Sequence, residues 1–168
     1  MKKLLVGCGV VAVGFVILVV AALIYIGTVG PGTAVVSGRQ LEQRFLDKVH
    51  ELGLLQEGET IQYFYSDAMV DIAGGLYLVT DRHVILYNDQ WPEPRIILPF
   101  EEVTSLEASY DDSFFVDSTL TLGLPDGSSI SFPVSSEQGG DRRVFEYIDQ
   151  RRPKGDEEAP DLLEAEGT

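Results

Sequence analysis

The stretch GLYLVTDRHVILY, residues 75–87, decides the fold that we expect for this chain. It opens with the apolar run GLYLVT at 75–80 and continues with the run HVILYN at 83–88. Both are rich in β-branched and aromatic residues, which favour strands. The polar pair Asp81-Arg82 between them is typical of a tight turn. The stretch therefore predicts an antiparallel β-hairpin.

Five more runs of strand type lie on both sides of this hairpin. They occupy residues 60–66, 95–99, 103–110, 114–124 and 128–134. The turn sequence PDG at 125–127 joins the last two runs as a second hairpin. Leu120, Leu122 and Leu124 alternate with Thr and Gly, a pattern typical of a sheet with one buried face. The chain therefore predicts seven antiparallel strands.

One amphipathic helix is expected before the strands and another after them. The first lies between Ser37, which forms a capping-box pattern with Gln40, and Gly53. Its apolar face carries Leu41, Phe45, Val49 and Leu52. The second is expected to be capped by Asp141 and to end at Pro153. Its apolar face carries Val144, Phe145 and Ile148.

The most apolar segment of the chain is its amino-terminal part. Lys2 and Lys3 precede residues 4–26, which carry no charge. At a rise of 1.5 Å per residue a helix of this length would measure about 34 Å, and the hydrocarbon core of a bilayer is about 30 Å thick. We therefore expect a transmembrane helix over residues 4–26, with the lipid bilayer as its partner.

Two other interpretations of this segment are a cleaved signal peptide and a lipoprotein signal. A signal peptide has a shorter apolar core of about 7–15 residues and a small-residue cleavage site. LVGC at 5–8 resembles a lipobox ending at Cys8, but almost no apolar segment precedes it. The first basic residue after the apolar run is Arg39, so the lysines favour a cytoplasmic N-terminus and a domain outside the cytoplasm.

Gly7, Gly14 and Ala21 are small residues spaced one heptad apart on the expected helix. Such a stripe allows two helices to approach closely, which would give a homodimer through this segment. The alternative is the ordinary Gly and Ala content of membrane helices.

Acidic residues dominate the rest of the chain. The sequence has 27 acidic and 12 basic residues, a net charge of −15 at pH 7, and every acid follows residue 26. This charge repels phosphate groups and therefore excludes nucleic acid as a partner. Residues 156–168 carry six acids and no base, which predicts a disordered acidic tail.

Three segments resemble those of bacterial PH-like and GRAM-type domains. They are EGETI at 57–61, the hairpin at 75–87, and LPFEEVTSL at 98–106. Those domains open with Gly-Glu and carry a hairpin of the form Gly-x-Leu-x-Leu-Thr-x-x-Arg. Seven strands followed by one helix is also the element order of the pleckstrin-homology superfold. The resemblance covers about residues 55–150 and implies a seven-stranded antiparallel β-sandwich or barrel.

Phosphoinositide-binding members of this superfold use Lys and Arg on and between their first two strands. The corresponding stretch here, SDAMVDIAG at 66–74, holds Asp67 and Asp71 and no base. We therefore expect no phosphoinositide headgroup as a ligand. Arg82 and His83 are expected to form a structural turn.

No pattern in the sequence indicates catalysis, a cofactor or a metal. His50 and His83 have no Cys, His or acidic neighbours at ligand spacing. The acids Asp111, Asp112 and Asp117 lack the spacing of a calcium loop. The serines form neither a G-x-S-x-G nor an S-x-x-K motif. The sequence therefore predicts no enzyme, no catalytic, cofactor-binding or metal-binding residues, and no cofactor.

Trp91 is the only tryptophan and lies in the two-proline loop NDQWPEP, residues 88–94. One interpretation is that it folds back and covers the edge of the sandwich, since most tryptophans are largely buried. The other is that it contacts a partner protein, since tryptophan is enriched at interface hot spots.

The sequence thus predicts one transmembrane helix followed by an α+β domain of PH-like type. The expected divisions are a cytoplasmic N-terminus at 1–3, the helix at 4–26, a linker at 27–38, the domain at 39–153 and the tail at 154–168. The predicted function is a membrane-tethered, non-enzymatic interaction module at the cell envelope that binds an unknown protein. The alternatives are a binding protein for a lipid or small apolar ligand at the sandwich edge, and an envelope enzyme.

Overall fold

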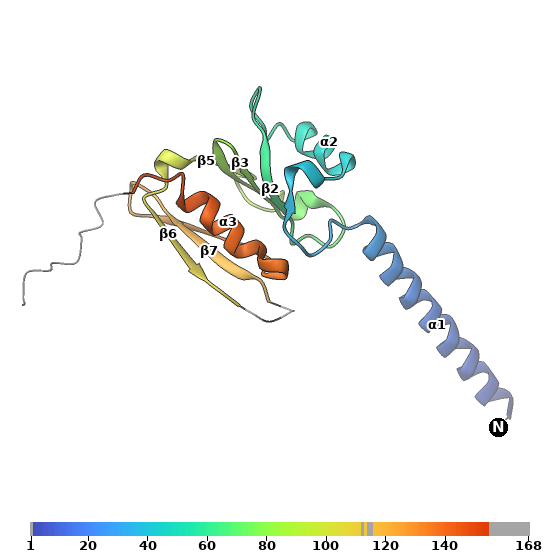
Figure 1. The fold of residues 1–168 in the computed structure, drawn as a ribbon. Helices are drawn as coiled ribbons and strands as arrows, with labels where there is room; N and C mark the ends of the chain where they lie inside the picture. The colour runs from blue at the N-terminus through green and yellow to red at the C-terminus, as the bar shows by residue number, and fades with distance from the viewer. Residues whose placement is uncertain (1, 112, 114–115, 155–168) are drawn as a thin grey trace, which may run out of the picture.

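The computed structural model describes the backbone of residues 2–111, 113 and 116–154. It describes side chains from Val13 onward within these ranges, except those of Ile26 and Val29. Two antiparallel sheets of five and three strands are packed together, with one helix beside each sheet and a third that extends away from the domain (Figure 1). The acidic tail expected at the C-terminus lies outside the described residues apart from Lys154.

The larger sheet has the strand order β1-β2-β3-β4-β5. Its strands are β1 (Val36–Ser37), β2 (Ile61–Tyr65), β3 (Leu76–Thr80), β4 (His83–Tyr87) and β5 (Arg95–Pro99). The hairpin predicted from residues 75–87 is confirmed, because Leu76 pairs with Tyr87 and the chain turns at Asp81 and Arg82. A β-bulge interrupts the register between β2 and β3: Ile61 pairs with Thr80, and the next pair is Tyr63 with Val79.

The smaller sheet has the order β6-β7-β8. Its strands are β6 (Ser105–Ser109), β7 (Ser118–Gly123) and β8 (Ser129–Val134). The alternation predicted for β7 is confirmed, since Leu120 and Leu122 are fully buried while Thr119 and Thr121 are half-buried. The smaller sheet therefore buries one face.

The helices and short 3₁₀ turns lie before, between and after the strands. The α-helices are α1 (Lys2–Val29), α2 (Gln43–Glu51) and α3 (Gly140–Asp149). The 3₁₀ turns are η1 (Gly38–Gln40), η2 (Ile72–Gly74), η3 (Phe100–Glu102) and η4 (Glu137–Gly139).

The larger sheet is covered on both faces, and this produces two apolar clusters. One cluster fills the space between the sheets and α3 and includes Tyr77, Leu120 and Ile148. The other lies under α2 and includes Phe45 and Val49 of that helix. All five residues of β3 are consequently buried, which explains the unbroken apolar run in the sequence.

Two expectations about local structure are wrong. The described residues form eight strands rather than the seven expected, because the short β1 pairs with Tyr63 and Phe64 of β2. The first helix of the domain begins at Gln43, several residues later than the capping-box pattern predicted. Ser37 is part of β1, and its hydroxyl donates to the Gln40 side chain at 3.1 Å instead of capping a helix.

The second helix also starts differently from the prediction. Gly139 is its N-cap residue and adopts a left-handed conformation with φ of 70°, which glycine tolerates best. Asp141 lies in the first turn, where its buried carboxylate accepts a hydrogen bond from the Ser118 hydroxyl at 2.6 Å. The predicted cap residue therefore ties α3 to β7.

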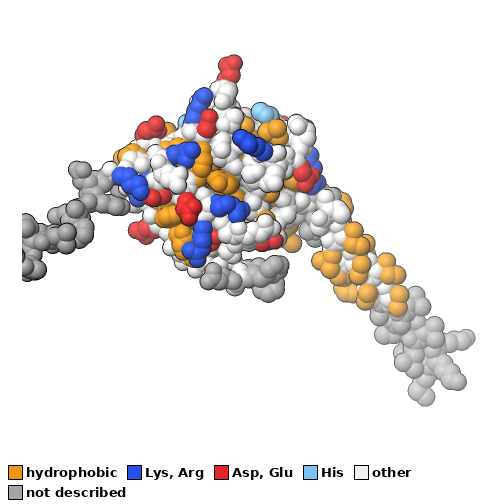
Figure 2. All heavy atoms as spheres, in the orientation of Figure 1, with side chains coloured by type: hydrophobic (Ala, Val, Ile, Leu, Met, Phe, Trp, Pro, Cys, Tyr) orange, Lys and Arg blue, Asp and Glu red, His pale blue; other side chains and the backbone are white. Residues whose placement is uncertain are grey.

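The expected transmembrane helix is contradicted. Residues 2–29 do form the helix α1, and the apolar side chains that are described on it are exposed (Figure 2). However, among the described residues no helix is both long enough and apolar enough for a membrane span. The predicted single-pass membrane location and the orientation that depended on it are therefore wrong as well.

Candidate functional site: a groove between α2 and β2

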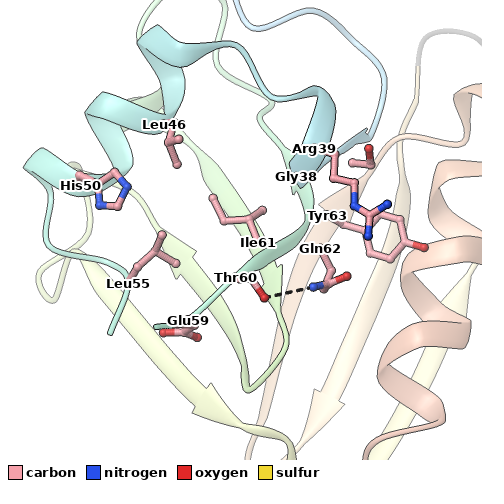
Figure 3. A pocket seen from close by; sticks show the side chains of 11 residues that line it. Gly38, Arg39, Leu46, His50, Leu55, Glu59, Thr60, Ile61, Gln62 and Tyr63 are labelled. Carbon is pink, nitrogen blue, oxygen red and sulfur yellow. Dashed lines mark hydrogen bonds between the residues drawn. The ribbon is translucent and has the colours of Figure 1, made fainter. Parts of the chain in front are cut away.

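An open groove of about 590 Å³ lies between α2 and the N-terminal half of β2. Figure 3 shows Leu46 and His50 projecting from α2 toward Ile61 and Leu55, with Arg39 and Tyr63 at the other end. The remaining lining residues are Ser37, Gly38, Glu59, Thr60 and Gln62. A volume of this size is typical of ligand-binding clefts.

The groove exists because β1 is short. β1 pairs only with Tyr63 and Phe64, so Ile61 and Gln62 have no neighbouring strand on their outer side. Gly38 ends β1 and packs directly on the carbonyl of Ile61, where any Cβ would overlap that oxygen. This close approach turns the chain into η1 and places Arg39 at the mouth of the groove.

One part of the groove is apolar. Leu46, Leu55 and Ile61 are half-buried, and Leu55 and Ile61 pack on the cluster beneath α2. The helix itself is fixed by Phe45 and Val49, which are buried, and the Phe45 ring stacks on that of Phe64 at 5.7 Å. The apolar floor is therefore supported by rigid elements.

The other part of the groove is polar and positively charged. Gln62 donates to the Thr60 hydroxyl at 3.3 Å, and the Tyr63 ring meets Tyr147 of α3 edge to face at 5.5 Å. The exposed Arg39 has no hydrogen-bond or ion-pair partner among the residues that the structure describes. In a chain with a net charge of −15, this guanidinium is available to an anionic group of a ligand.

Glu59 anchors the segment that forms the floor. Its side chain is fully buried and accepts hydrogen bonds from three donors: the Thr80 hydroxyl at 2.5 Å, the Gln56 amide at 2.8 Å and His83 Nδ1 at 2.7 Å. Burial raises the pKa of this carboxyl, but the three hydrogen bonds outweigh burial and hold the pKa below its usual value. An ionised Glu59 therefore locks residues 56–61 to the β3–β4 hairpin.

The end of the domain that carries the β2–β3 connection, residues 66–75, is called the loop end here and has a different electrostatic character. A hollow of about 340 Å³ there is lined by Asp67 and Asp117, among others. Tyr65 donates to Asp117 at 2.5 Å, and Tyr77 donates to Asp67 at 3.2 Å. Burial and the nearby carboxylates raise the pKa of both tyrosines, so these hydroxyls stay protonated. The carboxylates make this hollow unfavourable for an anion.

The residues singled out in the sequence lie away from the groove. Trp91 is half-buried and packs against the cluster between the sheets, as expected if it covers the sandwich edge. Its loop is tied to η2, because the Asn88 side chain donates to the Gly74 carbonyl at 2.8 Å. Gly7, Gly14 and Ala21 lie on α1, and an added Cβ at Gly14 would meet no atom within 4 Å. A role for these four residues in binding stays a prediction.

The two histidines have different surroundings. His50 is exposed on α2 and lines the groove. His83 was expected to form a turn with Arg82, but it is the first residue of β4 and is buried against Glu59. This pair was not predicted from the sequence, although Glu59 belongs to the Gly-Glu pattern at 57–61. Arg39 was not predicted as a site residue either, since a single exposed arginine carries no spacing signal. Among the described residues no group of three or more potential ligands could hold a metal ion.

Comparison with solved structures identifies the fold. A DUF1696-family protein with a pleckstrin-homology domain from Shewanella loihica PV-4 matches 73% of this chain and 100% of its own, with a TM-score of 0.50 and 15% sequence identity. A pleckstrin-homology domain from Shewanella amazonensis SB2B matches 65% of this chain and 96% of its own, with a TM-score of 0.45 and 15% identity. The domain has a pleckstrin-homology-like fold.

At this identity the first likeness shows the fold alone. The expected PH-like fold is thereby confirmed, whereas the more specific resemblance to GRAM-type domains stays a prediction. No family model matches the sequence, and no curated protein does.

Proposed function

We propose that this protein is a non-enzymatic interaction module that binds a segment of another protein in the groove between α2 and β2. The observation that carries the proposal is the groove itself, with an apolar floor at Leu46, Leu55 and Ile61. The Arg39 guanidinium at its mouth has no partner among the described residues. Protein interfaces combine such an apolar centre with a polar rim. The PH-like fold is compatible with many functions, so the proposal depends on this site.

The arrangement of polar groups favours binding over catalysis. The Glu59–His83 pair is the one close carboxylate–imidazole contact among the described residues. The nearest hydroxyl, that of Thr80, donates to Glu59 and is fully buried. It is therefore held as a structural donor and is not presented to a substrate as a nucleophile.

The hollow that the described residues leave between the two sheets is too small for a lipid or small apolar ligand. The hollow between the sheets, lined by Tyr65, Tyr77 and Phe132 among others, measures about 10 Å³. Ligand cavities are commonly larger by more than a factor of ten. Phosphoinositide recognition is equally disfavoured, since Asp67 and Asp117 line the hollow at the loop end.

The test is selection of octapeptides from a random display library by the full-length chain. Leu46→Asp places a charge on the apolar floor, and Ile130→Asp is a matched control on β8, where Ile130 is also half-buried. We expect enriched peptides to bind Leu46→Asp at least tenfold more weakly than the wild type, with Ile130→Asp unchanged, since one buried apolar contact contributes about 1.5–3 kcal/mol. Circular dichroism checks that both variants fold. Failure to enrich any peptide, or equal affinity for Leu46→Asp, would refute the proposal.

A further inference from the structure

The two ends of the groove differ in chemistry, and this difference restricts what can occupy it. Leu46, Leu55 and Ile61 form an apolar end, whereas Arg39 and Gln62 lie at a polar end (Figure 3). A ligand that fills the groove must therefore offer an apolar group and an anionic group a short distance apart. This inference rests on the proposed binding function and specifies the ligand.

Arg39 selects the anionic group. Its guanidinium is exposed and has no partner among the described residues, so binding a carboxylate breaks no existing ion pair. The planar fork of an arginine matches a carboxylate in a bidentate arrangement. The chain carries a net charge of −15, so an extended polyanion would be repelled by the rest of the surface. A single carboxylate beside an apolar group fits these conditions.

The walls of the groove distinguish a peptide from a fatty acid. Thr60, Gln62 and Ser37 also line the groove and contribute polar side chains to it. An alkyl chain lying along them would remove these groups from water without giving them hydrogen bonds, which is costly. A peptide backbone supplies donors and acceptors along its whole length. A peptide is therefore the better occupant.

We propose that the groove binds a short peptide that carries one Asp or Glu side chain, paired with Arg39, and one apolar side chain, packed on Leu46, Leu55 and Ile61. Both anchors come from the same peptide. The specificity of the groove therefore depends on two peptide side chains, one acidic and one apolar, at a fixed separation.

A specificity swap tests this proposal. Octapeptide selections are run in parallel on the full-length wild type, on Arg39→Glu and on Arg95→Glu, in which the altered residue is an exposed arginine on β5 at the opposite edge of the sheet. We expect the wild type and Arg95→Glu to enrich an acidic residue at a fixed distance from an apolar one. Arg39→Glu should enrich Lys or Arg at the same position and retain the apolar preference. An unchanged acidic preference in Arg39→Glu would overturn the assignment.

A labelled peptide from the wild-type selection then gives the strength of the pairing. Replacing the acidic residue of the peptide by Asn or Gln should weaken binding to the wild type about tenfold, as expected for the loss of a charge-assisted hydrogen bond. The same replacement should weaken binding to Arg39→Ala less than twofold. Equal losses in both proteins would overturn the pairing. If decanoate displaces the labelled peptide at a lower concentration than the unlabelled peptide does, and Arg39→Ala abolishes this displacement, the occupant is a fatty acid. That result would overturn the assignment of a peptide.

These outcomes separate the two proposals. If the wild type enriches no peptide, both the binding function and the ligand assignment fail. If it enriches peptides that require Leu46 but show no preference for an acid, the interaction module stands and the role of Arg39 is wrong.

Discussion

Glu59 and Asp67 are two carboxylates at opposite ends of the same domain, and their surroundings shift their pKa values in opposite directions. Glu59 is fully buried yet receives three hydrogen bonds, so its pKa is lowered. Asp67 receives one side-chain hydrogen bond, from Tyr77, and faces the charge of Asp117; its pKa is raised, mainly because the carboxylate loses hydration. For Glu59 the hydrogen bonds outweigh the effect of burial on the pKa, whereas for Asp67 they do not.

The difference bears on function as well as stability. At the Glu59 end the carboxylate accepts three hydrogen bonds, and these hold the floor of the groove in place. The Asp67 end holds two carboxylates around a hollow, where Tyr77 donates to Asp67 and Tyr65 donates to Asp117. A ligand with a carboxylate would therefore find its complement at Arg39 and repulsion at the loop end.

The largest change in the free energy of unfolding is expected when the hydrogen bonds of Glu59 are lost. Glu59→Gln keeps the shape of the side chain but replaces one acceptor oxygen by an amide NH₂ group, which is a donor and would face another donor. We expect the free energy of unfolding at pH 7 to fall by about 3 kcal/mol, because His83 and its neighbours lose their charged acceptor. Urea denaturation followed by circular dichroism measures the change.

Glu57→Gln is the matched control for this change. Glu57 lies two residues away and is exposed, so its neutralisation should alter the free energy of unfolding by less than about 0.5 kcal/mol. Similar losses for the two variants would mean that the buried hydrogen bonds of Glu59 do not stabilise the domain.

Glycine substitutions probe how tightly each end is packed. A Cβ at Gly38 would overlap the backbone carbonyl of Ile61, whereas a Cβ at Gly75 would overlap the side chain of Asp67. A backbone cannot move aside as a side chain can, so we expect Gly38→Ala to cost about 2 kcal/mol and Gly75→Ala less than about 1 kcal/mol. The same denaturation measurement gives both values, and the reverse order would contradict the rigid contact between β1 and β2.

The sequence was sufficient for the parts of the fold that depend on local patterns. The hairpin at 75–87 and the alternating leucines of β7 form as predicted, because strand propensity and a turn are both local. β1 could not be predicted, since two residues carry no periodicity and their pairing with Tyr63 and Phe64 depends on contacts distant in the sequence. The late start of α2 has the same origin: Gly38 packs on Ile61 and delays the helix.

The candidate site was less predictable than the fold. Glu59 and His83 are 24 residues apart and meet only because the β3–β4 hairpin turns beside the start of β2. Arg39 belongs to no motif, and it becomes notable only because it lies at the groove without a partner among the described residues. Trp91, the most conspicuous residue in the sequence, packs against the core. The rarity of tryptophan therefore did not point to the groove, and a role of Trp91 in binding stays a prediction.

The smallest effect concerns how stability changes with pH, and the two carboxylates should contribute with opposite signs. Glu59 has a lowered pKa in the folded state, so its contribution is present above its usual value of 4.5 and is lost as the pH falls through the folded pKa. Asp67 has a raised pKa, so the folded state holds the proton more tightly than the unfolded chain. Its contribution therefore decreases as the pH rises from its usual value of 3.8.

Urea denaturation between pH 3.5 and 7 of the wild type, Glu59→Gln and Asp67→Asn tests these signs. Glu59→Gln should flatten the loss of stability on the acid side. Asp67→Asn retains an oxygen that can accept from Tyr77 and removes the repulsion from Asp117, so it should equal or exceed the wild type in stability at pH 7. Asp89→Asn, at an exposed loop position, should leave the pH profile unchanged. If Asp67→Asn destabilised the domain as much as Glu59→Gln, both carboxylates would be structural acceptors, and the contrast between the two ends would be wrong.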